Sequence, residues 1–505
     1  MKTRFFLTAL LLSILFFSAC DEDNDIMNDI VVEDPDPEEN LIDTLITTGG
    51  IQFVRTPEEH FQNLPDWPYD YQYVEIDELR QAYAEAGPAD GAVVLLLHGQ
   101  PSWSYLYRTM IPVMADAGYR VIAMDHLGMG RSDKPVDITD YSYLGHADRL
   151  ERFIQQLGLS DINLFVQDWG SLIGLRVAGL NTDWFASISV GNGTLPVIPS
   201  GTQAIPPIQD PNEIADLISP FASFPAQQVP FYDGCELMME SGTLNFADWA
   251  NYAMKGASFK ASEVVEALTW FDLPADIEAA YDAPFPSREY MAGVRTFPSL
   301  VNELAGVNTE AWAGLMAYTN PFLTIWGAND AGNLGTCETQ QNFIQNVPGA
   351  ADKPHVRLPE AGHFLQSDQG EEIARRLVEF YTTDWENVEA IQCENFDSPI
   401  PNTGRTETSL PSSGFRNWQY CEVLPVFECG DDFVTEVYAS NSHNQCPDMD
   451  WFALNAEQLK NEFGMVDVIL NGPRHWVLDG LQGGDSNGGT GFDKVAAFGN
   501  IEMSL

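Results

Sequence analysis

The sequence predicts an α/β fold in which parallel strands alternate with helices. The run Val93–Leu97 is continuously apolar and the runs Ile162–Val166 and Pro321–Trp326 are largely so, which is typical of strands buried on both faces of a parallel sheet. Each run ends in a short turn, and the second is followed by a helix-like stretch, Leu172–Ala178. The repeated order of strand, turn and helix favours this class over an all-α or all-β fold.

The most informative turn reads Val-Gln-Asp-Trp-Gly at 166–170. A strand, tight turn and helix in this order predict a nucleophile elbow, which lifts one side chain above the sheet edge. The central residue is Asp168 rather than Ser or Cys. Its attack on a saturated carbon would give an alkyl ester that water can hydrolyse, whereas attack on a carbonyl would give a labile anhydride. The next residue, Trp169, carries an indole N–H that donates but cannot accept, which suits a departing anion. The alternative is an ordinary surface turn.

Partners for such a nucleophile follow in the required order. The strand at Pro321–Trp326 leads to Asp330, and the run His355–Leu358 leads to His363. The order Asp168, Asp330, His363 is that of nucleophile, acid and base in the hydrolase elbow fold. In this fold an oxyanion hole is formed by two main-chain N–H groups, here those of Gln100 and Trp169.

Several stretches resemble the haloalkane dehalogenases, a family of α/β-hydrolases with a helical cap. The resemblance covers residues 50–383 and favours the branch whose acid follows the seventh strand. In the other branch the acid follows the sixth strand, which here ends in Gly191-Asn192-Gly193 without a carboxylate. Asp368, a few residues beyond His363, is expected to be a solvated residue at a helix start. The matching stretches are 53–59, 98–108, 128–135, 167–170, 281–286 and 361–366.

The resemblance implies hydrolysis of a haloalkane to a primary alcohol and a halide. Asp168 would displace the halide and form an ester, and a water deprotonated by His363 would cleave that ester. Asp330 would hold the imidazole and stabilise its charged form. The implied partners are a small halogenated hydrocarbon, a halide ion and water. No metal and no organic cofactor is expected.

The resemblance also implies two indole donors to the halide, Trp169 and a tryptophan of the cap. The matching cap stretch is Phe246-Ala247-Asp248-Trp249, so Trp249 is the candidate. The alternative for Trp249 is ordinary helix packing, since Phe and Trp at i and i+3 also form a core face. Other possible donors are Trp103, Trp270 and the Gln100 side chain. The expected substrate-pocket residues are Phe246, Phe297 and Pro298.

The sequence divides into five predicted segments. The cap includes a stretch between Leu195 and Asn245 that is longer than the family pattern, and its effect on the pocket does not follow from the sequence. The segments are a lipoprotein signal peptide (1–20), an acidic tether (21–49), the α/β-hydrolase (50–385, with core 50–194 and 300–385 and cap 195–299), a linker (386–414) and a small α+β module of no assigned function (415–505).

The N-terminus has the pattern of an exported lipoprotein. Lys2 and Arg4 precede the apolar run Phe5–Phe17, which is too short to span a bilayer, and small residues stand directly before Cys20. Cys20 would then be the lipidated residue, and the alternative is a secretory signal with a chance cysteine. The acidic run that follows resembles a surface-export signal. We expect anchoring at the outer membrane or cell surface of a Gram-negative bacterium, with membrane contact only through the lipid.

The charge balance excludes a nucleic-acid partner. The chain has 24 Lys and Arg against 74 Asp and Glu, a formal net charge of −50, and nucleic-acid binding needs a basic footprint.

Cysteine usage fits an oxidising compartment. Four cysteines in the last part of the chain suggest two disulfides there, and a bridge between Cys235 and Cys337 is conceivable. The expected elements of that last part are strands at 422–427, 433–438 and 465–470 and a helix at 456–463.

Two other functions compete with dehalogenation. An epoxide hydrolase uses the same Asp nucleophile and His but needs cap tyrosines to protonate the epoxide oxygen. A non-catalytic surface lipoprotein that binds a ligand would have no use for the matched set of Asp168, Asp330 and His363.

Overall fold

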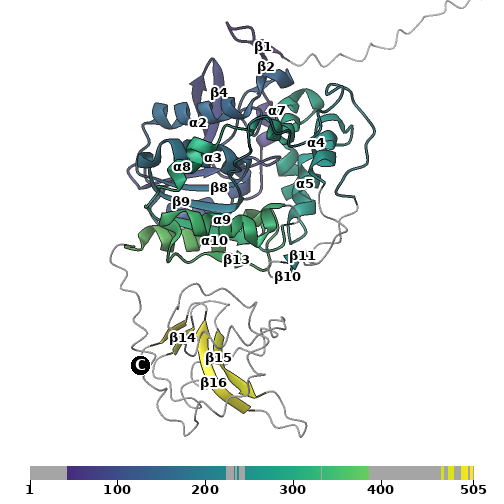
Figure 1. Cartoon of the computed structure of the whole chain (residues 1–505). Helices are drawn as coiled ribbons and strands as arrows, with labels where there is room; N and C mark the ends of the chain where they lie inside the picture. Colours follow the sequence, from purple (N-terminus) through teal and green to yellow (C-terminus); the bar gives the residue numbers. More distant parts are fainter. Residues whose placement is uncertain are drawn as a thin grey trace, which may run out of the picture. The chain divides into compact units, whose positions relative to one another are not determined.

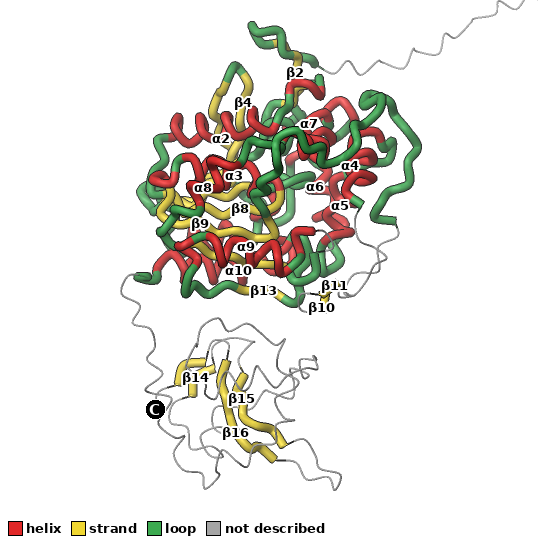
Figure 2. The backbone as a smooth tube through the Cα atoms, viewed as in Figure 1, coloured by secondary structure: helices red, strands yellow, loops and turns green. Residues whose placement is uncertain are grey.

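The computed structural model describes residues 43–222, 245–330 and 333–385, together with the strands at 232–233, 236–237, 468–470, 476–482, 491–498 and 501–503. Within residues 43–385, helices lie on both faces of one central sheet (Figure 1). The tube in Figure 2 shows the same layers, with the yellow strands enclosed between red helices. The predicted α/β class is therefore confirmed.

The central sheet has eight strands. They are β3 (Tyr71–Ile76), β4 (Leu79–Ala86), β5 (Val93–Leu97), β6 (Arg120–Met124), β8 (Ile162–Asp168), β9 (Phe185–Gly193), β12 (Phe322–Gly327) and β13 (Val356–Leu358). Their order across the sheet is β13-β12-β9-β8-β5-β6-β4-β3. All pairs from β13 to β6 are parallel, whereas β4 pairs antiparallel with both β6 and β3. The carboxyl ends of the parallel strands therefore meet at one edge, where ligands bind in open α/β sheets.

Six helices cover the sheet, and their cover explains why the central strands are buried and largely apolar. The helices α2 (Tyr143–Leu157), α3 (Trp169–Leu180), α8 (Thr309–Leu315) and α9 (Cys337–Asn346) lie on one face, and α1 (Met110–Asp116) and α10 (Leu365–Thr382) pack together on the other. Helix α2 shows the sequence signals that start and end a helix. Ser142 accepts a hydrogen bond from the Gly145 N–H at its start, and Gly158 ends it with a φ of 62°.

Most of the chain between β9 and α8 forms the cap. Its helices are α4 (Phe246–Lys255), α5 (Ala261–Leu268), α6 (Ala275–Asp282) and α7 (Ala292–Thr296), followed by the 3-10 helix η6 (Phe297–Glu303). Helix α4 packs against α7 and η6, and α5 packs against α6. The short paired strands β10 (Tyr232–Asp233) and β11 (Glu236–Leu237) also belong to this stretch.

The described part of the long cap stretch, residues 196–222, forms a strap across the cap. Its first half is held by Asn302, whose side-chain oxygen accepts from the N–H groups of Ala204 and Ile205 at 3.0 Å each. Its second half is held at the end of α4, where the Ala215 N–H donates to the Lys255 carbonyl at 2.9 Å. The strap then places Phe221 in the core of the cap.

Smaller strand groups complete the described residues. The strands β1 (Leu45–Ile46), β2 (Gln52–Val54) and β7 (Lys134–Pro135) form a three-stranded sheet. Near the C-terminus, β14 (Val468–Leu470) pairs with β17 (Ile501–Met503), and β15 (Trp476–Gln482) pairs with β16 (Gly491–Phe498), all antiparallel. Of these, the sequence analysis anticipated β14 but not the β15–β16 pair. The predicted signal peptide, most of the tether, the linker, the helix at 456–463 and the strands at 422–427 and 433–438 lie outside the described residues. No helix among the described residues is long and apolar enough to cross a membrane.

Candidate active site

Asp168 occupies a strained turn between β8 and α3. Its φ of 49° and ψ of −128° lie outside the regions that L-residues favour. Such strain persists only where the surrounding structure enforces it, and it is typical of functional sites. The strand before Asp168 is fully buried and α3 begins at the next residue, so the carboxylate is held at the carboxyl edge of the sheet. This is the predicted nucleophile elbow.

The two carboxylate oxygens of Asp168 have different surroundings. Oδ1 accepts a hydrogen bond of 2.7 Å from the Gln100 N–H. Oδ2 lies 3.4 Å from His363 Nε2. One oxygen is therefore held by the predicted oxyanion hole, while the other faces the imidazole.

His363 and Asp330 are joined at the opposite side of the ring. His363 Nδ1 lies 2.7 Å from Asp330 Oδ2, and both side chains are buried. The structure thus brings together Asp168, His363 and Asp330, which belong to the loops after the fifth, eighth and seventh strands of the sheet.

The charges around His363 favour its protonated form. Burial alone lowers the pKa of the imidazole, but the charge of Asp330 and the hydrogen bonds to Asp168 and Asp330 outweigh burial and raise the pKa to about 10. With both carboxylates ionised, the ring carries a proton at neutral pH.

Gly99 lies in the turn that follows β5 and allows this turn to approach Asp168 closely. A Cβ at this position would lie 2.2 Å from Asp168 Oδ1, closer than real contacts allow. A side chain at 99 would therefore displace the carboxylate or the Gln100 N–H that binds it.

Two of the predicted halide donors lie in buried, aromatic surroundings. Trp169 is 5% exposed and packs edge-to-face on Phe297, with ring centroids 5.6 Å apart. Trp249 on α4 is also 5% exposed, and Phe221 of the strap packs edge-to-face against it at 5.2 Å. Within the described part of the chain, neither indole N–H makes a hydrogen bond. Both donors are therefore available to a ligand.

Two of the other donor candidates, Trp103 and the Gln100 side chain, are engaged elsewhere. The Trp103 indole donates to the Ala280 carbonyl at 3.1 Å, and the Gln100 side chain donates to the Val294 carbonyl at 2.9 Å. The predicted pocket residues are placed close to the site by η6, which begins with the fully buried Phe297 and contacts α4. Phe246, the first residue of α4, is partly buried against the core.

The sequence and the fold of this chain match known proteins. A family described as alpha/beta hydrolase fold matches residues 92–214. The chain is 40% identical over 335 residues to the haloalkane dehalogenase of Mycobacterium marinum, an alignment that covers 64% of this chain and 98% of that protein. The chain belongs to the haloalkane dehalogenase family. The enzyme is also 36% identical over 340 residues to the haloalkane dehalogenase of Psychrobacter cryohalolentis, which covers 65% of this chain and 98% of that protein.

A solved structure agrees with this assignment. The haloalkane dehalogenase DpaA from Paraglaciecola agarilytica matches with a TM-score of 0.52 and 29% sequence identity, over 66% of this chain and 100% of that chain. The protein is thus a hydrolase of the dehalogenase family, which acts on halogenated substrates and releases halide with water. The predicted family, fold and enzyme class are confirmed, and the epoxide hydrolase and non-catalytic alternatives find no support in these relatives.

Two residues of the dehalogenase site were missed by the sequence analysis. Asn192, fully buried at the end of β9, donates from Nδ2 to Asp330 Oδ2 at 2.9 Å and accepts from the Gly327 N–H at 2.6 Å. Gln167 donates from Nε2 to the His363 carbonyl at 3.0 Å. The signal for Asn192 was present, because it follows the sixth strand, where the other branch carries its acid.

The prediction that Asp368 is a solvated residue is wrong. Its carboxylate accepts hydrogen bonds from the main-chain N–H groups of Trp270, Phe271 and Gly362. Burial raises its pKa to about 7, against the lowering effect of these hydrogen bonds. The start of α10 is covered by the end of α5, which the local sequence around Asp368 does not reveal.

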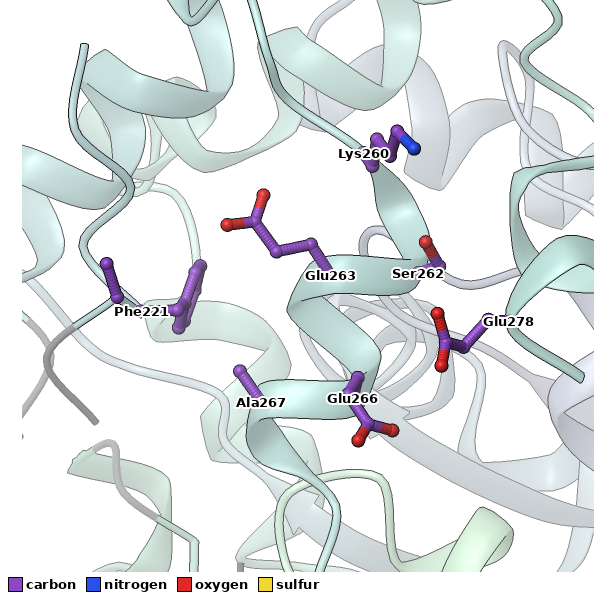
Figure 3. Close-up of a pocket in the computed structure, with 8 residues that line it drawn as sticks. Phe221, Lys260, Ser262, Glu263, Glu266, Ala267 and Glu278 are labelled. Carbon is purple, nitrogen blue, oxygen red and sulfur yellow. The ribbon is translucent and has the colours of Figure 1, made fainter. Parts of the chain in front are cut away.

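A separate pocket of about 390 Å³ lies on the cap of the dehalogenase (Figure 3). Figure 3 shows Phe221 facing α5, which follows Lys260 and carries Glu263, Glu266 and Ala267. None of Asp168, Asp330 and His363 lines it. Glu263 accepts a hydrogen bond from the Tyr252 hydroxyl at 2.8 Å, so this carboxylate already has a structural partner.

The charge on His363 should make the stability of the dehalogenase depend on pH. The folded-state pKa of about 10 lies above the ordinary value of 6.5. The stabilising contribution is therefore fully present below pH 6.5 and is lost as the pH rises through about 10, by an amount on the order of a few kcal/mol.

Urea unfolding between pH 6 and 10.5 checks this expectation. The free energy of unfolding of the parent should fall more steeply over this range than that of His363→Asn. Other buried groups, such as Lys134, whose pKa burial lowers to about 7, titrate in both proteins and cancel in the comparison. Parallel curves for the two proteins would show that His363 carries no raised pKa.

Proposed function

We propose that this dehalogenase cleaves the carbon–halogen bond through an ester on Asp168, formed and hydrolysed in two displacements. The observation that carries the proposal is the difference between the two Asp168 oxygens. Oδ1 accepts from the Gln100 N–H at 2.7 Å, and Oδ2 is turned toward His363 at 3.4 Å. An arrangement with one oxygen held and one exposed to the reaction space suits a carboxylate nucleophile.

In the first step Asp168 Oδ2 attacks the carbon that bears the halogen. The new bond is carbon–oxygen, the broken bond is carbon–halogen, and the halide leaves with the electron pair. The indole N–H groups of Trp169 and Trp249 donate to the departing halide in a buried site, where hydrogen bonds to an anion are strong. This step needs no base.

In the second step water attacks the ester carbon of Asp168. Esterification removes the Asp168 charge, which is one of the interactions that raise the pKa of His363. The ring then releases its proton more easily and becomes a base for the water, while Asp330 stabilises the imidazolium that forms. The oxyanion develops on Oδ1, where the Gln100 N–H already donates. The net reaction consumes the haloalkane and water and yields alcohol, halide and a proton.

Turnover in H₂¹⁸O tests the two-step route. Because water attacks the ester carbon, the alcohol of the first turnover carries the original Asp168 oxygen, and ¹⁸O enters the carboxylate of Asp168. Mass spectrometry of the peptide that contains Asp168 should show this label after many turnovers. If the first alcohol carries ¹⁸O and the peptide stays unlabelled, water attacks the substrate directly and the proposal is wrong.

Trp249→Phe should weaken halide binding. Phe fills most of the same space but lacks the N–H donor, so the contact with Phe221 is largely retained. Losing one donor to a buried anion costs about 1.5–3 kcal/mol, which corresponds to a ten- to hundredfold weaker affinity. Titration of bromide, followed by quenching of tryptophan fluorescence, gives the dissociation constant.

The matched control is Trp312→Phe. Trp312 lies on α8 and packs against Phe343, with ring centroids 5.5 Å apart, on a helix that covers the sheet. Trp312→Phe should bind bromide as the parent does. Parental bromide affinity and parental turnover in Trp249→Phe would assign Trp249 to packing alone.

We further propose that the enzyme is an exported lipoprotein anchored through Cys20. The support is the sequence of residues 1–20, with its basic start, short apolar run and small residues before the cysteine. In the producing bacterium, Cys20→Ser should move the enzyme from the membrane fraction to a soluble fraction. Retention of this variant in the membrane fraction would contradict the anchor.

A further inference from the structure

The end of helix α5 is hydrogen-bonded to the loop that carries His363. The His363 N–H donates to the Leu268 carbonyl at 2.8 Å. Leu268 is the last residue of α5, so a cap helix directly holds the main chain of the histidine. The two segments are almost 100 residues apart in the sequence, and their contact exists only in the folded chain.

The carboxylate of Asp368 joins the same two segments. Oδ1 accepts from the N–H groups of Trp270 and Phe271 at 2.9 and 3.1 Å, on the cap side. Oδ2 accepts from the Gly362 N–H at 2.8 Å, on the side of the histidine loop, and from the Trp270 N–H at 3.0 Å. The carboxylate therefore bridges the residue before His363 and the residues that follow α5.

Gly362 shows how close this contact is. A Cβ at position 362 would lie 2.3 Å from the Leu268 carbonyl oxygen. Since that oxygen belongs to the main chain, it has little freedom to move aside. The loop and the cap fit together only because residue 362 has no side chain.

The surroundings of Asp368 disfavour the ionised form of its carboxyl group. Burial raises the pKa of its carboxyl to about 7, and the charge of Arg108 together with the three main-chain donors acts in the opposite direction. Arg108 itself donates to the Tyr281 hydroxyl at 3.1 Å, so it ties α6 of the cap to the same region. A buried carboxylate needs hydrogen bonds from all three of these main-chain N–H groups.

We propose that Asp368 is a positioning residue that couples the cap to His363 and so controls the hydrolysis of the ester intermediate. The proposal rests on the role given above to His363 as the base. The hydrogen bonds of Asp368 go to Trp270, Phe271 and Gly362 and not to Asp168 or the rest of the elbow, so the first displacement should not depend on them. Only the step that needs the imidazole should respond.

Asp368→Asn tests the coupling. An amide has one acceptor oxygen, so its NH₂ group must face either the Gly362 N–H or the cap N–H groups, and one half of the bridge is lost. With 1,2-dibromoethane we expect the first burst of bromide to keep its parental rate and the later ester hydrolysis to slow at least tenfold. Mass spectrometry during steady turnover should then find Asp168 largely esterified.

Asp272→Asn is the matched control, because Asp272 lies in the same cap segment but is exposed. Asp272→Asn should keep the parental rates of both the bromide burst and the ester hydrolysis. If both rates of Asp368→Asn fall by the same factor, or neither falls, Asp368 has only a structural role or none, and the proposal is overturned.

Gly362→Ala provides a second variant should Asp368→Asn fail to fold. Its new methyl group pushes against Leu268 while Asp368 stays intact, and the same selective loss of ester hydrolysis is expected. Failure of the underlying mechanism is recognised separately, because His363→Ala would then accumulate no ester at all.

Discussion

His363→Ala is expected to complete one displacement per enzyme molecule and then stop. The first step needs no base, so Asp168 should be alkylated at close to the parental rate. Ester hydrolysis then lacks the imidazole that activates water, and general-base catalysis typically contributes about 10²- to 10⁴-fold. A stoichiometric burst of bromide from 1,2-dibromoethane, followed by almost no further release, is the expected time course.

Mass spectrometry identifies the trapped species. The peptide that contains Asp168 should gain one bromoethyl group in the variant and none in the parent at the end of the reaction. His60→Ala is a suitable control, because His60 is exposed on the 3-10 helix Glu58–Phe61. Steady turnover by His363→Ala, or an unmodified Asp168 after the burst, would contradict the two-step mechanism.

Asp330→Asn should also lose steady turnover, by roughly 10³- to 10⁴-fold in kcat. The carboxylate lies 2.7 Å from His363 Nδ1 and is a main cause of the raised pKa of the ring. An amide at this position cannot stabilise the imidazolium, so the ester should accumulate as in His363→Ala. Because Asp168 is untouched, the bromide burst should remain.

The bromide burst and the steady rate of turnover together distinguish loss of the acid in Asp330→Asn from misfolding of this variant. A misfolded fraction lowers both in proportion, whereas loss of the acid lowers only the steady rate. Asp116→Asn, an exposed substitution of the same type at the end of α1, should change neither. Parental steady turnover by Asp330→Asn would remove Asp330 from the mechanism and point to another carboxylate.

The core of the site could be predicted from the sequence because its signals are local. Asp168 and Asp330 each follow a largely apolar run and His363 follows the run His355–Leu358, and these runs became β8, β12 and β13. Parallel strands place their carboxyl ends at one edge, so residues that follow such strands meet there. The spacing of apolar residues was therefore enough to bring the three side chains together.

The cap was predicted less completely because its contacts are not local. Trp249 was placed by resemblance, but the packing of Phe221 against it depends on the path of the strap, residues 196–222. That path is held by hydrogen bonds to Asn302 and to the main chain at Lys255. A stretch rich in Pro and polar residues carries no periodic pattern from which such anchors could be inferred.

The sequence by itself determined the family, the chain order of the strands that carry the site, and an overall charge that disfavours binding to nucleic acid, and it predicted Asp168 as the nucleophile. These depend on residue type and on spacing along the chain. Only the tertiary structure decided that Asn192 supports Asp330 and that Asp368 joins the cap to the histidine loop. The physical reason is that the donors to Asp368 are main-chain N–H groups, which every residue but proline has. Which of them face a carboxylate, and how much water is left around it, is fixed only when distant segments pack.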